Sequence, residues 1–284
     1  MASDGRDVEV PLPIRSKPDE ELTLSDQLRH RDRLTAESLR ELATGEIDVI
    51  WHREYYPPEQ CDAALPRVVR AVDETNFLLT KEFTSVGTSM GEVANGGDSV
   101  QRYLDTATDT TRLIRHDVFA GQQSPTDLVR LDLDEMWPYG ATVGRHDGRI
   151  MLPGVLRRMT PGGRGRPHID RRQIPLLDTY RLHRRLGVNI YLEVPEPGAG
   201  GEIDFWGTLS EEEFVALKAD PFDYGIEPER VGPPLDTVLP GKGDLVMFEA
   251  GRMHGVREVR AGCRTSAACF IGVRAETDPL LIFA

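Results

Sequence analysis

The chain has 284 residues and a formal net charge of −13 at pH 7, which is long enough for one large domain with a well-buried core. Its acidic balance argues against general nucleic-acid binding, which needs a basic face for the phosphates. No apolar run approaches the ~20 residues that span a bilayer, and the N-terminal MASDGRDVEV lacks an apolar secretory core. Three cysteines without CxxC spacing favour free thiols in a reducing compartment. We therefore expect a cytoplasmic protein without nucleic-acid or membrane partners.

The N-terminal part of the chain has mainly helical patterning. Residues 1–20 are polar and contain prolines, which predicts a loose tail. Residues 21–138 are predicted to be mainly helical support, beginning with a helical pattern over about 21–45, in which Thr35 can cap AESLRELAT and Gly45 can end it. The apolar IDVIW at 47–51 predicts one short strand within this part.

Proline and glycine divide the rest of this part. A helical period resumes after Pro58, and Pro66 is expected to kink or split that helix. Residues 84–98 are rich in glycine, serine and threonine, which predicts a loop. Ser124 followed by Pro125 is a good start for a helix that runs to about Met136.

Residues 139–284 are predicted to form a β core. Short apolar runs alternate with glycine and proline, and one helix interrupts them at 210–220. The runs are GVLRRMT, GVNIYLEVP, GGEIDFWG, DTVLP, GDLVMFEAG and CRTSAACFIGVRAE. Several short strands with turn signals predict a sandwich or barrel. No polar linker separates the two parts, so we expect an α+β fold in which residues 1–284 are a single domain.

A candidate metal site begins at RPHIDRR, residues 166–172, where His168 and Asp170 have HxD spacing. This spacing alone is weak, because a histidine near an acid is often a surface or hydrogen-bonded residue. His254 follows the apolar GDLVMFEAG, which places it at a strand end, where a barrel would open. Two imidazoles and one carboxylate form the facial triad of non-haem Fe(II) oxygenases, whereas zinc prefers four tetrahedral ligands.

The segment RTS adds a candidate anion site. Strand side chains alternate between faces, so Arg264 and Ser266 share one face. An arginine that faces a barrel interior needs an anion, because a buried unpaired charge is costly. A dicarboxylate held by the guanidinium and a hydroxyl meets that need. An internal ion pair with Glu202 or Asp204 meets it equally well, so both interpretations stay open.

Together these residues resemble the 2-oxoglutarate/Fe(II)-dependent oxygenases, in particular their prolyl-hydroxylase-like branch. The pattern comprises H-x-D at 168–170, His254 and R-x-S at 264–266. GVNIYLEVPEPGAGGEIDFW and LPGKGDLVMFEAGRMHGVREVRAGCRTS are similar to the strands that surround those motifs in the family. The resemblance covers about 140–275, and the N-terminal half matches nothing that we can place.

The resemblance implies a double-stranded β-helix, a cupin-like jelly roll with supporting helices on one face. It implies that His168, Asp170 and His254 bind Fe(II), and that Arg264 and Ser266 bind the distal carboxylate of 2-oxoglutarate. Asn189 and Tyr191 share one strand face and are candidates for contact with 2-oxoglutarate or substrate. A packed tyrosine beside an edge asparagine is the alternative.

An arginine-rich segment surrounds the HxD motif. Between Arg157 and Arg185 there are nine arginines and two aspartates, a local balance of +7. A positive patch at a mouth attracts anions, so Arg166 and Arg171 are candidates for binding a substrate carboxylate. The alternative is a solvated loop that pairs with acidic neighbours. Trp206 is a candidate wall of the substrate pocket, although large aromatic residues are more often core.

The resemblance implies an enzyme that uses Fe(II), 2-oxoglutarate and O₂ to hydroxylate an unactivated C–H bond, with release of succinate and CO₂. Related halogenases have glycine or alanine where this chain has Asp170, so hydroxylation is favoured. The expected substrate is a small molecule, a free amino acid or an amino-acid-derived precursor in natural-product biosynthesis. Desaturation, epoxidation or cyclisation by the same iron chemistry stays open, as does a homodimer. A non-catalytic jelly-roll protein that binds a ligand is the alternative of another class.

Overall fold

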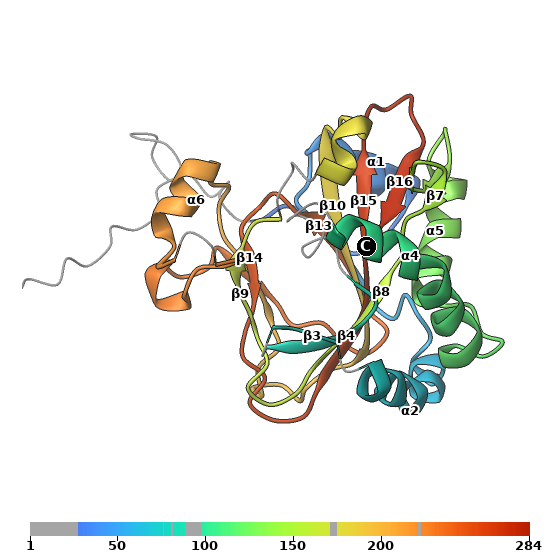
Figure 1. Cartoon of the computed structure of the whole chain (residues 1–284). Coiled ribbons are helices and arrows are strands. Elements are labelled where there is room, and N and C mark those ends of the chain that lie inside the picture. Colours follow the sequence, from blue (N-terminus) through green and yellow to red (C-terminus); the bar gives the residue numbers. More distant parts are fainter. Residues whose placement is uncertain (1–27, 76, 81, 89–97, 171–174, 221–222) are drawn as a thin grey trace, which may run out of the picture.

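A computed structural model describes residues 28–75, 77–80, 82–88, 98–170, 175–220 and 223–284. The predicted tail at 1–20 lies outside these residues. Two β-sheets face each other, and helices cover the outer face of the larger one (Figure 1). The combination of helices with a large sheet confirms the coarse part of the fold prediction. Within the described residues, no helix has the length and apolar character needed to cross a membrane.

The larger sheet has ten strands. Its main path is β1 (His30–Arg31), β2 (Val49–His52), β13 (Leu245–Glu249), β10 (Arg184–Glu193), β15 (Arg264–Val273), β8 (Val155–Met159), β4 (Phe83–Val86) and β3 (Phe77–Thr80). Beside this path, β16 (Leu280–Phe283) pairs with β15 and with β5 (Ala141–Val143). The N-terminal part of the chain thus supplies both ends of the sheet, and the C-terminal part supplies its centre.

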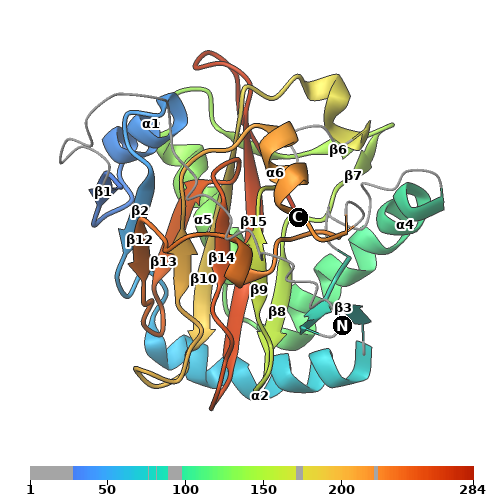
Figure 2. The same ribbon diagram turned by 90° about the vertical axis from the view of Figure 1, so that its left-hand side faces the viewer.

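The smaller sheet has four strands and lies opposite the centre of the larger one (Figure 2). Its order is β12 (Asp236–Val238), β11 (Ile203–Phe205), β14 (His254–Val256) and β9 (Gly165–His168). The eight strands from β8 to β15 are therefore shared equally between the two sheets. A separate hairpin joins β6 (Arg145–His146) to β7 (Arg149–Ile150).

The two faces of the larger sheet differ in chemistry. On β10, Val188 and Ile190 belong to the main apolar core beneath the helices, whereas Tyr191 packs with residues of the smaller sheet. On β15, Ala267 and Cys269 belong to the same main core. Because successive side chains point to opposite faces, residues 264 and 266 turn toward the smaller sheet, as the alternation in the sequence predicts.

The helices supply the cover of the outer face. They are α1 (Ala36–Thr44), α2 (Pro58–Thr75), α4 (Asp98–Arg112), which continues into a π-helical turn at Leu113–Val118, and α5 (Pro125–Met136). The helix α6 (Glu211–Leu217) instead lies beside the smaller sheet (Figure 1). Two short 3₁₀ turns lie at Pro175–Tyr180 and Pro228–Arg230. Thr35 caps α1 by accepting the Ser38 N–H, and Gly45 ends it with a φ of 86°, as predicted.

Three local predictions differ from the structure. Residues 28–35 are not helical but contain β1, which pairs with β2. Pro66 does not split its helix, because α2 is continuous from Pro58 to Thr75. Pro66 and Asp62 lie on the exposed side of α2, where water can bond the carbonyl that loses its partner. The predicted loop at 84–98 contains most of β4, whose pairing with β8 outweighs the loop-like composition. Residues 89–97 lie outside the described part.

Asp244 ties the N-terminal part to the centre of the larger sheet. Its buried carboxylate accepts hydrogen bonds from Trp51 Nε1 at 2.7 Å, from the Glu54 N–H at 2.9 Å and from the Gly241 N–H at 2.8 Å. Its own carbonyl accepts the Tyr191 N–H at 3.0 Å. Asp244 thus connects the start of β13, the turn that follows β2 and the end of β10.

We expect Asp244→Ala to lower the free energy of unfolding by about 3 kcal/mol, because three donors lose their buried, charged acceptor. Asp62→Ala is the matched control, since it removes an exposed pair with Lys242 and is expected to cost less than about 1 kcal/mol. Urea unfolding measures both. Equal losses in the two variants would show that the Asp244 bonds add nothing beyond a surface ion pair.

Candidate metal centre

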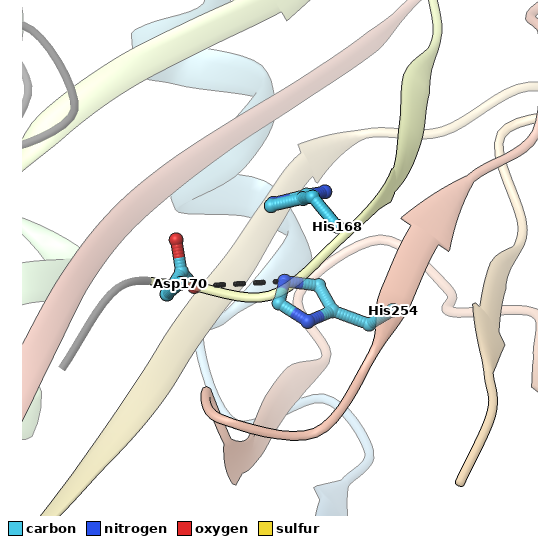
Figure 3. A group of neighbouring side chains, drawn as sticks. All are labelled: His168, Asp170 and His254. Carbon is cyan, nitrogen blue, oxygen red and sulfur yellow. Dashed lines mark ion pairs between the residues drawn. The ribbon is translucent and has the colours of Figure 1, made fainter. Parts of the chain in front are cut away.

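His168 and His254 lie opposite each other in the smaller sheet. His168 ends β9 and His254 begins β14, and the two are direct partners in this antiparallel pair. Their ring centroids are 4.3 Å apart. Asp170 follows β9 by two residues, and its N–H donates to the Ala250 carbonyl at 3.0 Å. The pairing and this bond bring the three predicted side chains together (Figure 3).

Backbone carbonyls select the free nitrogen of each ring. His168 Nδ1 donates to the Arg166 carbonyl at 2.7 Å, and His254 Nδ1 donates to the Arg252 carbonyl at 2.8 Å. A carbonyl only accepts, so Nδ1 carries the hydrogen and Nε2 keeps its lone pair. His254 Nε2 lies 3.6 Å from Asp170 Oδ2 (Figure 3). One candidate ligand atom from each residue lies within 4.8 Å of the others, so the three could hold one metal ion.

The surroundings of His254 favour its neutral form. Burial lowers its pKa to about 4, the neighbouring His168 lowers it as well, and Asp170 opposes the shift. Phe248 packs edge-on against the His254 ring at 4.6 Å. Phe248 lies opposite Gly187 of β10, and a Cβ at Gly187 would lie 3.0 Å from the Phe248 ring. The missing side chain at 187 therefore leaves room for the aromatic support of His254, whose lone pair is available at neutral pH.

Arg264 and Ser266 form a buried polar pair on the inner face of β15. The guanidinium lies 4.9 Å from the centroid of the Tyr191 ring, and Nη2 donates to the Tyr191 hydroxyl at 3.1 Å. Within the described ranges, Arg264 Nε and Ser266 Oγ are buried atoms without a hydrogen-bond partner. A buried cation beside an unsatisfied hydroxyl is the environment that a carboxylate fits.

The alternative ion pairs for Arg264 do not form. Asp204 instead accepts two hydrogen bonds from Arg257, at 2.7 and 2.8 Å. No carboxylate of the described residues, Glu202 included, lies within ion-pair distance of Arg264. Among the described residues, the ion pair to Glu202 or Asp204 is therefore absent, and Arg264 Nε and Ser266 Oγ keep unused hydrogen-bonding capacity.

Tyr191 and Asn189 occupy the same inner face. Tyr191 is fully buried, and burial raises the pKa of its hydroxyl, which stays protonated. That hydroxyl accepts from Arg264 and still has a proton to donate. Asn189 lies two residues earlier on β10, opposite Ala268. Because Val188 and Ile190 face the main core, both predicted residues face the region between the sheets.

Arg166 and Trp206 have contacts that match the alternatives given for them. Arg166 donates to both carboxylate oxygens of Asp223 at 2.5 Å and to Glu227 at 3.1 Å, so its guanidinium is already engaged. This agrees with the alternative of a charged segment that pairs with acids. Trp206 is buried in an apolar cluster with Phe214, and its Nε1 donates to the Gly232 carbonyl at 2.8 Å. Arg171 lies outside the described residues.

Sequence reasoning missed two aromatic contacts of the histidine rings. Phe248 was recognisable only as part of an apolar strand. Tyr224 packs edge-on against His168 at 5.8 Å from a segment without periodic patterning. No signal in the sequence indicated that contact, because it depends on how the connection between β11 and β12 folds back.

Residues 154–272 match the family model of the 2OG-Fe(II) oxygenase superfamily. This part of the chain is similar to the 2OG-Fe(II) oxygenases, and the matched range contains both histidines, Asp170, Arg264 and Ser266. The resemblance, the class of enzyme and the cofactors Fe(II) and 2-oxoglutarate predicted from the sequence agree with this match.

Individual relatives are more distant. The chain is 31% identical over 166 residues to an L-gamma-glutamyl-L-propargylglycine hydroxylase from Streptantibioticus cattleyicolor, an alignment that covers 55% of this chain and 59% of that protein. An N-substituted L-amino acid dioxygenase from Burkholderia ambifaria AMMD has a similar solved structure, with a TM-score of 0.59 and 16% identity over 88% of this chain and 91% of that one. Its complex with alpha-KG gives a TM-score of 0.58 at 17% identity over the same shares of the two chains. At these identities the solved structures support the fold alone.

We expect the His168→Ala/His254→Ala double variant to lose divalent-metal binding, because two of three ligands are removed. His183→Ala is the matched control, since His183 is exposed and lies outside the cluster. Anaerobic titration with Fe(II), followed by metal analysis after desalting, measures the bound metal. Stoichiometric iron in the double variant would refute the metal assignment.

Proposed function

We propose that this chain is an Fe(II)- and 2-oxoglutarate-dependent oxygenase that hydroxylates an unactivated C–H bond of a small molecule. The observation that carries the proposal is the cluster of His168, His254 and Asp170, in which one candidate ligand atom of each residue lies within 4.8 Å of the others. The buried Arg264 on the inner face of β15 has an Nε without a hydrogen-bond partner, which an anion could supply. One site therefore offers ligands for a metal ion and a receptor for a carboxylate.

The strand order supports the proposed double-stranded β-helix. Four strands of the larger sheet, in the order β13–β10–β15–β8, face the four of the smaller sheet, β12–β11–β14–β9. Successive strands from β8 to β11 alternate between the two sheets, as they do in a jelly roll. We take residues 139–284 as the catalytic core, 21–138 as its support and 1–284 as a single domain.

The three ligands would hold Fe(II) through His168 Nε2, His254 Nε2 and Asp170. Three protein ligands leave positions for 2-oxoglutarate and O₂, and these bound groups supply the oxidising chemistry that ends in succinate, CO₂ and an alcohol. The protein's part is to fix the ring orientations through the two Nδ1–H bonds. Asp170 fills a coordination position with a carboxylate, which favours hydroxylation over halogenation.

The inner face of the larger sheet would hold 2-oxoglutarate. Arg264 Nε and Ser266 Oγ have unused donors, and the Tyr191 hydroxyl adds a third. A carboxylate that accepts from these groups replaces the hydrogen bonds they lack, so binding satisfies buried polar atoms. Asn189 is proposed to contact either 2-oxoglutarate or the substrate, because it lies on the same face.

The proposed substrate is a free amino acid or an amino-acid-derived precursor. One named relative, which is 31% identical over 166 residues, acts on an L-gamma-glutamyl amino acid. The other, which is similar in fold, acts on N-substituted L-amino acids. Substrate-dependent release of succinate across free, N-substituted and gamma-glutamyl amino acids tests the proposal. The expected product is one oxygen atom heavier than its substrate. No succinate with any compound would favour the non-catalytic ligand-binding protein, and a product two hydrogens lighter would indicate desaturation or cyclisation.

We expect Arg264→Gln to weaken 2-oxoglutarate binding about a hundredfold, because truncating a buried charged partner costs roughly 2–5 kcal/mol. Ser266→Ala removes one neutral hydrogen bond, worth about 1 kcal/mol, so its effect is several-fold. Arg260→Gln is the control, since its guanidinium donates to the Gly198 carbonyl on the exposed surface. The visible band of the anaerobic Fe(II)–2-oxoglutarate complex reports binding. Equal affinity in Arg264→Gln and wild type would contradict the proposed anion site.

A further inference from the structure

The connection between β11 and β12 returns along the strand that carries His168. It contains α6, which lies beside the smaller sheet (Figures 1 and 2). After α6, the Tyr224 ring packs against the His168 ring with centroids 5.8 Å apart and an interplanar angle of 73°. A segment far from the HxD motif in sequence thus forms one wall of the candidate metal centre.

Arg166 binds this segment to β9 through several carboxylates. Arg166 pairs with Asp223 and Glu227, which belong to this segment. Its Nε also lies 3.2 Å from Oε1 of Glu82, which precedes β4. Its guanidinium carbon lies 4.5 Å from the centroid of the Tyr224 ring. We call Glu82, Arg166, Asp223, Tyr224 and Glu227 the Arg166 cluster. The side chain of Arg166 is 12% exposed, so water screens these contacts less than those of a surface pair.

Backbone contacts bring the segment close to β9. The Arg166 N–H donates to the Tyr224 hydroxyl at 3.1 Å, and the Ile226 N–H donates to the Pro167 carbonyl at 2.8 Å. Burial raises the pKa of Tyr224 to about 12, so its hydroxyl keeps the proton that it donates to Glu82. At Gly225 a Cβ would lie 2.9 Å from Arg166 Cβ, so this approach depends on glycine.

Arg166 also contacts the His168 ring through its backbone. Its carbonyl accepts the His168 Nδ1–H at 2.7 Å, while its side chain holds Tyr224 against another part of the same ring. The ring is therefore restrained by a hydrogen bond at Nδ1 and by an aromatic contact. His254 has the corresponding pair of restraints in the Arg252 carbonyl and Phe248.

We propose that Arg166 and Tyr224 are positioning residues, which fix the orientation of the His168 ring for metal binding by holding the β11–β12 connection against it. The inference rests on the proposed function, because it takes His168 as a metal ligand. In this proposal, Arg166 orients a metal ligand and does not bind the substrate. Groups that orient ligating histidines typically change metal affinity by 10–100-fold when they are removed.

The test is Co(II) binding by the full chain, measured anaerobically through the visible bands of the bound ion. We expect Arg166→Gln and Tyr224→Leu each to weaken Co(II) binding about tenfold or more and to change the positions or intensities of the bands. Tyr224→Phe keeps the ring but loses the hydroxyl, so its bands should match those of wild type with only a several-fold loss of affinity. Arg166→Lys should not restore binding, because an ammonium cannot form the paired bonds to Asp223.

Arg115→Gln separates positioning from general stability. Arg115 also forms two hydrogen bonds to one aspartate, Asp127, but in the helical part of the chain. We expect it to lower Tm about as much as Arg166→Gln does and to leave Co(II) binding unchanged. Wild-type affinity and bands in both Arg166→Gln and Tyr224→Leu would overturn the inference, as would equal losses of affinity in Arg115→Gln. Wild-type Co(II) binding in His168→Ala would instead contradict the proposed function itself.

Discussion

His168 and His254 face each other because β9 and β14 are paired in one antiparallel register. A shift of that register by one residue would turn one imidazole to the other face of the sheet. Each ring is then oriented by the carbonyl two residues before it, in Arg166 and in Arg252. The local backbone therefore selects Nε2 as the free nitrogen in both residues. Every functional proposal for this chain depends on that arrangement.

The larger sheet meets two opposite requirements on its two faces. The outer face is apolar and packs against the helices, whereas the inner face carries buried Arg264, Ser266 and Tyr191. Burying these groups without an anion leaves donors unsatisfied, which opposes folding. The rigid apolar layer behind these groups offsets that cost. The hydrogen bonds of Asp244 contribute further stability at the end of β10. The stability of the helical support is thus coupled to the polar face of the site.

Much of the site could be predicted because its signals are local. HxD spacing, a histidine at a strand end and the alternation of Arg264 with Ser266 each follow from a few neighbouring residues. The helix limits at Thr35, Gly45 and Ser124 follow from capping for the same reason. These features need no knowledge of how distant segments approach one another.

The remaining features depend on contacts between distant segments. Arg166 looked like an anion receptor because its partners are far along the chain, with Glu82 on one side and Asp223 on the other. The contact of Tyr224 with His168 arises only when the β11–β12 connection folds back. The strand at Phe83–Val86 forms because β8 offers it a partner. Composition describes none of these pairings, so charge and residue type alone could not choose between the two interpretations of Arg166.

A crystal structure of the anaerobic Fe(II)–2-oxoglutarate complex, with anomalous data at the iron edge, tests the central claim most directly. The account predicts one iron peak within bonding distance of His168 Nε2, His254 Nε2 and an Asp170 oxygen. It also predicts that the far carboxylate of 2-oxoglutarate lies against Arg264 and Ser266. An iron peak elsewhere, ligation through Nδ1, or a 2-oxoglutarate carboxylate away from Arg264 would contradict it.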